Sequence, residues 1–169
     1  MKNTMNTITG HTDSRLELSC RDKNEEFISG EKNILIATAD PVNAELIIDE
    51  LSVENNKEIT LKASGSEVID FFQKTDIDVV NMEHLIDLII LDLRLPEVCG
   101  IDVLKFLKKN PVRKTIPVII FSTSSDIKTI SEVYRNGACG FITIPASFKE
   151  FSENIKVLKR CLSNSRKQP

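Results

Sequence analysis

The sequence predicts an α/β fold, in which helices cover both faces of a parallel β-sheet. One observation behind this prediction is the apolar run from Leu88 to Leu91, which ends at Asp92 and does not alternate with polar residues. A short run of this kind is typical of a strand buried on both faces, as the strands of parallel sheets are. The other observation is that such runs alternate with amphipathic helical patterns, which indicates successive βαβ units.

Five strands and five helices are expected in alternation along the chain. The predicted strands are residues 33–40, 58–63, 88–92, 116–123 and 139–144. The predicted helices begin at Pro41, after Ser66, at Ile101, after Ser125 or Asp126, and at Ser147, and the last of them runs through Leu162. Because βαβ crossovers are right-handed in nearly all cases, we expect a three-layer sandwich with strand order 2-1-3-4-5.

Local signals indicate where these helices begin and end. Asp40 and Pro41 open the first helix, since aspartate caps a helix and proline suits its first turn. Gly137 ends the fourth helix, and Ser147 with Glu150 forms a capping box for the fifth. The expected apolar stripe of the first helix is Val42, Leu46, Ile47 and Leu51.

Composition favours one soluble domain and excludes several functional classes. The chain has 169 residues, of which 41% are hydrophobic and 28% charged, and a net charge of −3. This slight acidic excess argues against a nucleic-acid groove, which would need a basic stripe. No apolar run approaches the length of a membrane span, and the N-terminus lacks the apolar segment of a secretory signal, so we expect a cytoplasmic protein.

Cysteine and histidine spacing gives no sign of a metal centre. The four cysteines show no CxxC pair and are expected to be free thiols, and the two histidines have no companions at ligand spacing. These residues are Cys20, Cys99, Cys139, Cys161, His11 and His84.

The chain divides into one domain and two terminal segments. Residues 1–32 are polar and without periodicity, so we expect a flexible N-terminal extension. Within it, only Leu16–Leu18 and Phe27-Ile28 are apolar enough to pack, and a short docking motif is an open alternative. The domain is expected over residues 33–163, followed by a C-terminal tail at 164–169.

Asp92 is the leading candidate for a functional residue. It follows a buried strand directly, and in open α/β sheets ligands bind at the carboxyl ends of the strands. A carboxylate there serves as a nucleophile or metal ligand, or it caps the following loop. The sequence around Asp92 does not decide between a functional carboxylate and a loop-capping one.

The stretch from Asp87 to Gly100 resembles the third strand and following loop of response-regulator receiver domains. In that family an aspartate accepts a phosphoryl group and is followed by Leu or Met, Pro and Gly at fixed offsets, which here are Leu95, Pro96 and Gly100. The resemblance covers about 33–162 and implies a flavodoxin-like (βα)5 fold. It also implies that Asp92 is the phosphoacceptor of a CheY-like receiver, which we expect to stand alone because no further domain follows the last helix.

The resemblance also shows where this chain departs from the family. Receiver domains carry two acidic residues at the end of the first strand, and these positions hold Thr38 and Ala39. The hydroxyl that ends the fourth strand is kept as Ser122. The family's lysine, directly before Pro145, is replaced by Ile144. The expected phosphorylation pocket therefore keeps its nucleophile and its hydroxyl but lacks both acidic ligands and the lysine.

This departure predicts weak Mg²⁺ binding or none. Mg²⁺ prefers about six oxygen ligands, usually with one or two carboxylates. Here Asp92 and the backbone carbonyl of Arg94 would stand nearly alone. A one-residue slip that brings Asp40 to the edge is an alternative, and the Arg94 side chain could partly replace the lysine, although a surface partner is the simpler interpretation of that arginine.

Three functions compete on this basis. The leading hypothesis is a diverged pseudo-receiver in phosphorelay signalling that acts by binding other proteins, such as a histidine kinase or a downstream target. Its expected contact face is formed by helix four, strand five and helix five, includes Tyr134 and Phe141, and could also support a homodimer. Phe141 matches the family's switch aromatic, but an aromatic residue in a strand packs in the core more often than not. The second is a working phosphoacceptor that uses Asp92 and Ser122. An enzyme on a similar fold is the remote alternative, because a P-loop is absent and position 94 is Arg, where a phosphatase would need Asp.

Overall fold

The computed structural model describes residues 6–8, 16–18, 32–52, 56–75, 86–123, 126–144, 147 and 149–155. Within these residues five parallel strands form the centre of one sheet, in the spatial order β4-β3-β5-β6-β7. Their bounds are β3 Lys32–Ala37, β4 Asn56–Lys62, β5 Leu88–Asp92, β6 Val118–Ser122 and β7 Gly140–Thr143. This is the order 2-1-3-4-5, so the predicted α/β fold class is confirmed.

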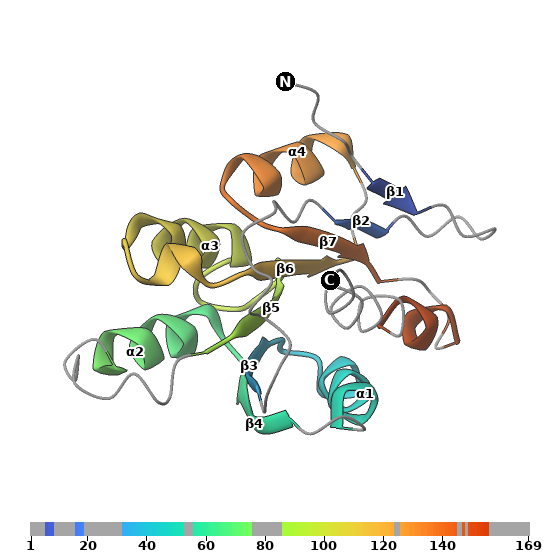
Figure 1. Ribbon diagram of the computed structural model, residues 1–169, viewed down its shortest axis with the longest axis horizontal. Helices are drawn as coiled ribbons and strands as arrows, with labels where there is room; N and C mark the ends of the chain where they lie inside the picture. The colour runs from blue at the N-terminus through green and yellow to red at the C-terminus, as the bar shows by residue number, and fades with distance from the viewer. Residues whose placement is uncertain are drawn as a thin grey trace, which may run out of the picture.

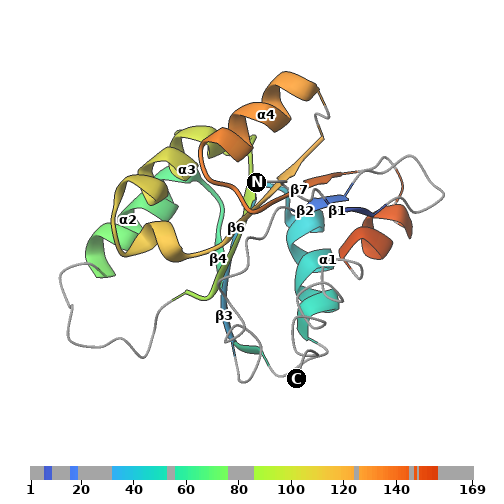
Figure 2. The same cartoon turned by 45° about the horizontal axis from the view of Figure 1, so that its top comes forward.

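Helices cover both faces of this sheet (Figures 1 and 2). Their bounds are α1 Pro41–Ser52, α2 Gly65–Thr75, α3 Gly100–Lys109 and α4 Ile127–Arg135, with a short 3-10 helix at Arg113–Thr115 and further helical residues at 149–155. One face carries α2, α3 and α4, and the other carries α1 and the helical residues 149–155.

The core consists of two apolar layers, one on each face of the sheet. Every residue of β5 and of β6 is buried. Along β5, Ile89 and Leu91 contribute to the layer under α2, α3 and α4, whereas Leu88 and Ile90 contribute to the layer under α1. Fully burying each such side chain is worth about 1.5–3 kcal/mol. An apolar run without alternation is therefore what a strand covered on both faces requires.

Most helix ends follow the predicted signals. Asp40 accepts hydrogen bonds from the backbone N–H groups of Val42 and Asn43 and so caps α1. Asp126 rather than Ser125 caps α4, because its side chain accepts from Thr129 N–H at 2.9 Å. The predicted stripe of α1 was wrong in one member: Val42 is 60% exposed, because it lies in the first turn.

Strand β6, which corresponds to the predicted strand 116–123, is shorter than predicted. β6 begins at Val118 and not at Ile116, because Ile116 donates its N–H to Arg113 and thereby closes the 3-10 turn. Pro117 then has no N–H to contribute to the ladder.

Two short antiparallel strands extend the sheet at the edge of β7. β1, Asn6–Ile8, pairs with β2, Leu16–Leu18, and β2 pairs with β7. Leu16–Leu18 is one of the two segments that the sequence indicated as able to pack. The flexibility of the rest of residues 1–32 and the domain boundaries at 33, 163 and 164 stay predictions.

Several predicted features lie outside the described residues. These are Phe27, Ile28, Cys20, Cys161, both histidines, Pro145 and the C-terminal tail. Within the described part of the chain, neither Cys99 nor Cys139 belongs to a disulfide. No helix in that part is long and apolar enough to cross a membrane.

Candidate functional site

The candidate site lies where β3, β5 and β6 end at their carboxyl edge. The register pairs Ala37 of β3 with Leu91 of β5, so the next residues along, Thr38 and Asp92, come together. Ser122 is the last residue of β6, the strand on the other side of β5. The β3–β5 boundary is also the point where the strand order reverses, which is where open α/β sheets bind ligands.

Asp92 is a buried carboxylate held by two hydrogen bonds. Its side chain is 4% exposed. Oδ1 accepts from the backbone N–H of Arg94 at 2.8 Å, and Oδ2 accepts from the hydroxyl of Thr38 at 3.3 Å. A charge taken out of water needs such donors, because burial without hydrogen bonds is costly. The anion is thus compensated by a neutral amide and a neutral hydroxyl.

Two glycines lock the loop that follows Asp92. A Cβ on Gly100 would lie 2.3 Å from the backbone oxygen of Asp92, and a Cβ on Gly65 would lie 1.9 Å from the backbone oxygen of Val98. Gly100 also donates its N–H to Leu93, and Gly65 donates to Pro96. Only glycine permits this close approach, so the glycine eight positions after Asp92 has a packing role. The loop fixes the backbone that orients the carboxylate.

The end of β3 carries no metal-binding carboxylate. Thr38 is buried, and besides donating to Asp92 its hydroxyl accepts from the backbone N–H of Asp40 at 3.3 Å. Ala39 is exposed. Asp40 is also exposed, and its carboxylate caps α1. A carboxylate engaged in this cap does not reach Asp92, so the one-residue slip that would bring Asp40 to the site is not observed.

The ends of β6 and β7 provide a hydroxyl and no cation. Ser122 is 1% exposed, and its backbone carbonyl accepts from the N–H of Ile144 at 2.7 Å. Ile144 is half-buried and packs against the apolar layer under α1. Arg94, the nearest basic residue in the Asp92 loop, is exposed. The position of the family's lysine is therefore an apolar contact.

The residues of this site do not fit Mg²⁺. In the part of the chain that the structure describes, no group of three or more His, Cys, Asp and Glu side chains is placed to hold a metal ion. Asp92 supplies one carboxylate at the end of β5, and the neighbouring side chain, Thr38, is a hydroxyl that donates its hydrogen to Asp92. A divalent cation would have to displace this hydrogen bond and find its charge compensation in a single carboxylate.

The two aromatic residues of the expected contact face have different positions. Phe141 is 1% exposed and belongs to the core layer under α2, α3 and α4, so its interpretation as a core aromatic is confirmed and its ring does not lie on the surface of the contact face. Tyr134 on α4 is half-buried and packs against the same layer from outside. Of the two, Tyr134 alone is accessible to another molecule.

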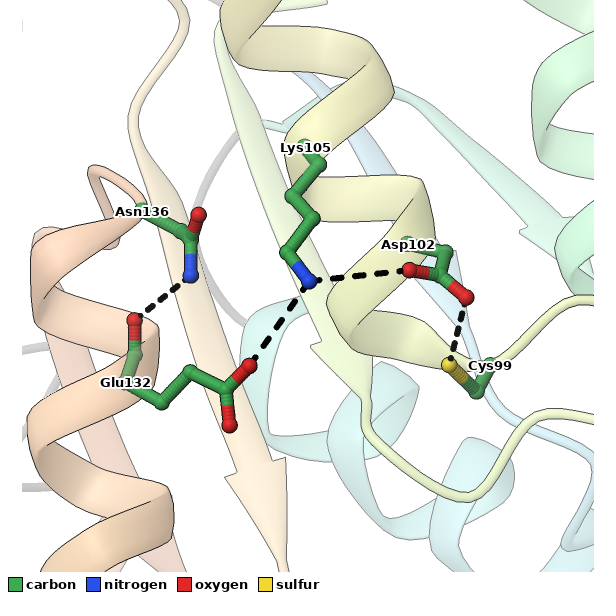
Figure 3. Close-up of polar contacts among 5 residues, drawn as sticks. All are labelled: Cys99, Asp102, Lys105, Glu132 and Asn136. Atoms are coloured by element: carbon green, nitrogen blue, oxygen red, sulfur yellow. Dashed lines mark hydrogen bonds and ion pairs between the residues drawn. The ribbon is translucent and has the colours of Figure 1, made fainter.

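A chain of polar contacts connects the loop after Asp92 with α4 (Figure 3). The Cys99 thiol donates to Asp102 Oδ2 at 3.2 Å, and Lys105 Nζ lies 3.8 Å from Asp102 Oδ1 and 3.6 Å from Glu132 Oε1. Exposed pairs of this kind are worth little singly, so these contacts add little to the stability of the fold.

Sequence reasoning missed the role of Thr38. It treated this residue as a lost acidic ligand, whereas the structure shows a donor to Asp92. A hydroxyl residue directly after a buried strand, next in sheet order to the Asp92 strand, was the available signal.

A buried aspartate at the end of the central strand, followed by a glycine-locked loop, defines a receiver-type signalling module on this fold. Residues 34–156 match the response regulator receiver domain, and the chain belongs to this family. Polar-differentiation response regulator DivK of Brucella ovis is 33% identical over 126 residues, which are 74% of this chain and 94% of DivK. The two-component response regulator ARR20 of Arabidopsis thaliana is 29% identical over 75% of this chain, but that match spans only 26% of the Arabidopsis protein.

Solved structures agree with this assignment. A response regulator receiver domain from Rhodospirillum rubrum superimposes with a TM-score of 0.69 at 31% identity, over 80% of this chain and 95% of that one. The phosphorylated cyanobacterial phytochrome response regulator RcpA superimposes with a TM-score of 0.71 at 25% identity, over 83% of this chain and 99% of that one.

Proposed function

We propose that this receiver domain is a diverged pseudo-receiver, which signals by binding other proteins and does not take a phosphoryl group at Asp92. The observation that carries the proposal is the set of groups around that carboxylate. Thr38 donates a hydrogen bond to it, Ala39 is exposed and has no polar side chain, and Ile144 packs as an apolar residue.

The physical reason is charge. Phosphoryl transfer brings an anion to a carboxylate, and catalysis in such reactions consists mostly of positioning and of neutralising the charge that develops. A site whose buried carboxylate accepts from two neutral donors, with the apolar Ile144 at the position of the family's lysine, supplies the positioning without the neutralisation. An incoming phosphoryl group would meet a carboxylate whose two donors, the Thr38 hydroxyl and the Arg94 N–H, are neutral groups, so its approach would be opposed by charge repulsion.

A phosphodonor assay tests this proposal. The native chain and the triple variant Thr38→Asp, Ala39→Asp, Ile144→Lys are each incubated with acetyl phosphate and Mg²⁺, and the added phosphate is measured by intact-protein mass spectrometry. The triple variant should be modified, because it regains metal ligands and a fixed cation, whereas the native chain should resist.

Two controls make the result specific. Adding Asp92→Asn to the triple variant should abolish its modification, which assigns the phosphate to Asp92. Thermal unfolding with and without Mg²⁺ reports whether the three new charges disturb the fold. Modification of the native chain as fast as the triple variant would show that the pocket works as it stands.

The second candidate function is a working phosphoacceptor with Asp92 as the acceptor. Two observations favour it. Ser122 is buried at the end of β6, the strand next to that of Asp92, and the glycine-locked loop that follows Asp92 is intact. RcpA, which is similar in fold, is described as phosphorylated. The assay above separates the two candidates directly.

The proposed partners are signalling proteins, either a histidine kinase or a downstream target, in the cytoplasm. The proposed contact face consists of α4, β7 and the helical residues 149–155, with Tyr134 as its aromatic anchor. This face could also support a homodimer. A binding role without catalysis agrees with membership of a family of signalling proteins.

A further inference from the structure

We propose that the outer edge of β4 is a homodimer interface, at which a second copy of this chain adds its own β4 as an antiparallel strand. The two copies would be related by a two-fold axis that passes beside Thr60. This interface lies at the opposite end of the sheet from β7, so it leaves the proposed contact face free. It does not depend on whether Asp92 accepts a phosphoryl group.

The first supporting observation is that the two edges of the parallel sheet differ. β7 at one edge is covered by β2, whereas β4 at the other edge pairs only with β3 among the described residues. Figure 1 shows β4 at this end of the sheet, with α1 and α2 on its two sides. β4 is also the longest of the described strands, and its sequence contains no proline. A long open edge of this kind readily accepts another extended chain.

Backbone direction shows which groups β4 presents at this edge. Thr38, directly after β3, donates its N–H to the carbonyl of Lys62, so the backbone groups of Lys62 face β3. Backbone groups alternate between the two sides of a strand, and the ladder with β3 is regular from Glu58 to Lys62. Ile59 and Leu61 therefore direct their N–H and C=O groups to the outer edge.

A two-fold register centred on Thr60 makes this edge complementary to itself. Ile59 then lies opposite Leu61 of the second copy, and since both residues face the outer edge, the pair can exchange two backbone hydrogen bonds. Glu58 lies opposite Lys62 of the second copy, which places opposite charges together at each end of the interface. The neighbouring registers that keep the hydrogen bonds, centred on Ile59 or Leu61, would separate these charges.

The side chains on the face toward α1 agree with this register. Ile59 packs against the apolar layer under α1, and Leu61, two residues further, lies on the same face of the strand. Leu61 is 46% exposed, and among the exposed large hydrophobic side chains of the described residues it is the one that lies in a strand. In the dimer it would contact Ile59 of the second copy and lose exposed apolar surface.

The side chains on the face toward α2 carry the charges. Lys62 lies over the ring of Phe71 of α2, with Nζ 5.2 Å from the ring centroid, so Glu58 and Thr60 share this face. Glu58 and Lys62 do not pair within one chain, because four residues along a strand span about 13 Å. Their attraction can be satisfied along the strand edge by a second copy in the two-fold register.

Charge reversal in the full chain tests the interface. Glu58→Lys would bring two lysines together at each end, and Lys62→Glu would bring two glutamates together. The native chain should dimerise below about 1 mM, and each single variant should raise the dimer dissociation constant about tenfold or more. Sedimentation equilibrium measures both constants.

Mixing the two variants separates the interface from any effect on folding. In a mixed dimer each end joins a lysine to a glutamate, so an equimolar mixture should dimerise much more tightly than either variant alone. Thermal unfolding of each variant checks that the monomer persists, since Lys62 also contacts Phe71. Damage to the monomer fold would not be repaired by mixing.

Disulfide cross-linking tests the register. Thr60 lies opposite itself in a pair without backbone hydrogen bonds, where Cβ atoms are about 4.5–5.5 Å apart, so Thr60→Cys should form an intermolecular disulfide with oxidised glutathione. Glu58→Cys lies on the same face, but its two copies would be about 13 Å apart and should cross-link far less. Peptide mapping distinguishes these disulfides from any formed by the native cysteines.

Four outcomes would overturn the proposal. One is a native chain that is still monomeric at about 1 mM. The second is a mixture of Glu58→Lys and Lys62→Glu that is no more dimeric than its components. The third is cross-linking of Glu58→Cys as efficient as that of Thr60→Cys. The fourth is a dimer that Tyr134→Ala dissociates and the charge reversals leave intact, because this would place the interface on the contact face.

Discussion

Thr38 donates its hydroxyl hydrogen to Asp92 Oδ2 at 3.3 Å, and both side chains are only 4% exposed. The same hydroxyl accepts from the N–H of Asp40, so it connects the carboxylate with the start of α1. A residue in the position of an acidic metal ligand has thereby become a neutral donor. It satisfies one oxygen of the buried Asp92 carboxylate as a neutral donor, and this is the physical basis for the proposal that Asp92 is a fixed feature of the fold and not a switch.

Replacing Thr38 by valine should destabilise the protein by about 1–3 kcal/mol at neutral pH, because it leaves a buried carboxylate oxygen without its donor at nearly unchanged shape. Urea unfolding measures the free energy change. The control is Thr60→Val in the edge strand β4, which should change the stability by less than about 0.5 kcal/mol. A Thr38→Val protein as stable as the native chain would show that the hydrogen bond contributes nothing.

Mg²⁺ should bind weakly, since no cluster of acidic side chains in the described part of the chain is placed to hold it at Asp92. NMR shifts around Asp92 during a Mg²⁺ titration should not saturate in the low-millimolar range. Thr38→Asp with Ala39→Asp should bind at least about tenfold more tightly, and without metal it should be less stable because like charges crowd the site. Saturation of the native chain at low-millimolar Mg²⁺ or below contradicts this prediction.

Gly100→Ala should destabilise the protein by about 1–3 kcal/mol or more, because overpacking against backbone cannot relax easily. The added Cβ would lie 2.3 Å from the backbone oxygen of Asp92. Chemical unfolding measures the effect, with the exposed helical exchange Ser131→Ala as control. If Gly100→Ala is neutral, the loop after Asp92 is more compliant than its contacts indicate.

The sequence was sufficient for the fold because the central strands β5 and β6 contain continuous apolar runs. Leu88 to Leu91 and Val118 to Phe121 have no polar interruption, and only a sheet covered on both faces buries such runs completely. The loop after Asp92 was equally predictable, since Gly100 stands at a position where no other residue fits.

The remaining features depend on three-dimensional register. That Thr38 reaches Asp92 follows from the pairing of β3 with β5, which a sequence does not specify. Phe141 could be assigned to the core or to the surface only once the neighbours of β7 were known. The pairing of Leu16–Leu18 with β7 joins segments more than a hundred residues apart through three backbone pairs, which leaves almost no pattern in the sequence.

Lys108 gives a prediction about pH. Its Nζ donates to the backbone carbonyls of Lys114 and Ile116 at 3.1 and 2.7 Å, and burial lowers its pKa below the ordinary lysine value, against a smaller opposing effect of Cys139. Because the unfolded chain then binds the proton more tightly than the folded one, Lys108 costs stability below its folded pKa. This cost disappears as the pH rises toward the ordinary lysine pKa.

Comparing the native chain with Lys108→Met isolates this effect. The native chain should gain unfolding free energy relative to the variant as the pH rises from about 8 toward 10. Near pH 7 the variant should still be less stable, since two carbonyls lose their donor. A stability difference that stays constant between these pH values would show that the pKa of Lys108 is not lowered by folding.

Tyr134 offers a direct test of whether a signal from Asp92 reaches α4. It is the single tyrosine of a chain without tryptophan, so tyrosine fluorescence reports this one residue. If Asp92 accepts no phosphoryl group, acetyl phosphate with Mg²⁺ should leave the fluorescence of the native chain unchanged and equal to that of Asp92→Asn treated in the same way. In the triple variant Thr38→Asp, Ala39→Asp, Ile144→Lys, the same treatment should change it, because a new charge at the strand ends can bias the packing of α4. Phe141 belongs to the core layer against which Tyr134 packs, and this layer is the packed connection expected to carry such a change. A fluorescence response in the native chain that Asp92→Asn abolishes would establish Asp92 as a working switch and refute the pseudo-receiver proposal.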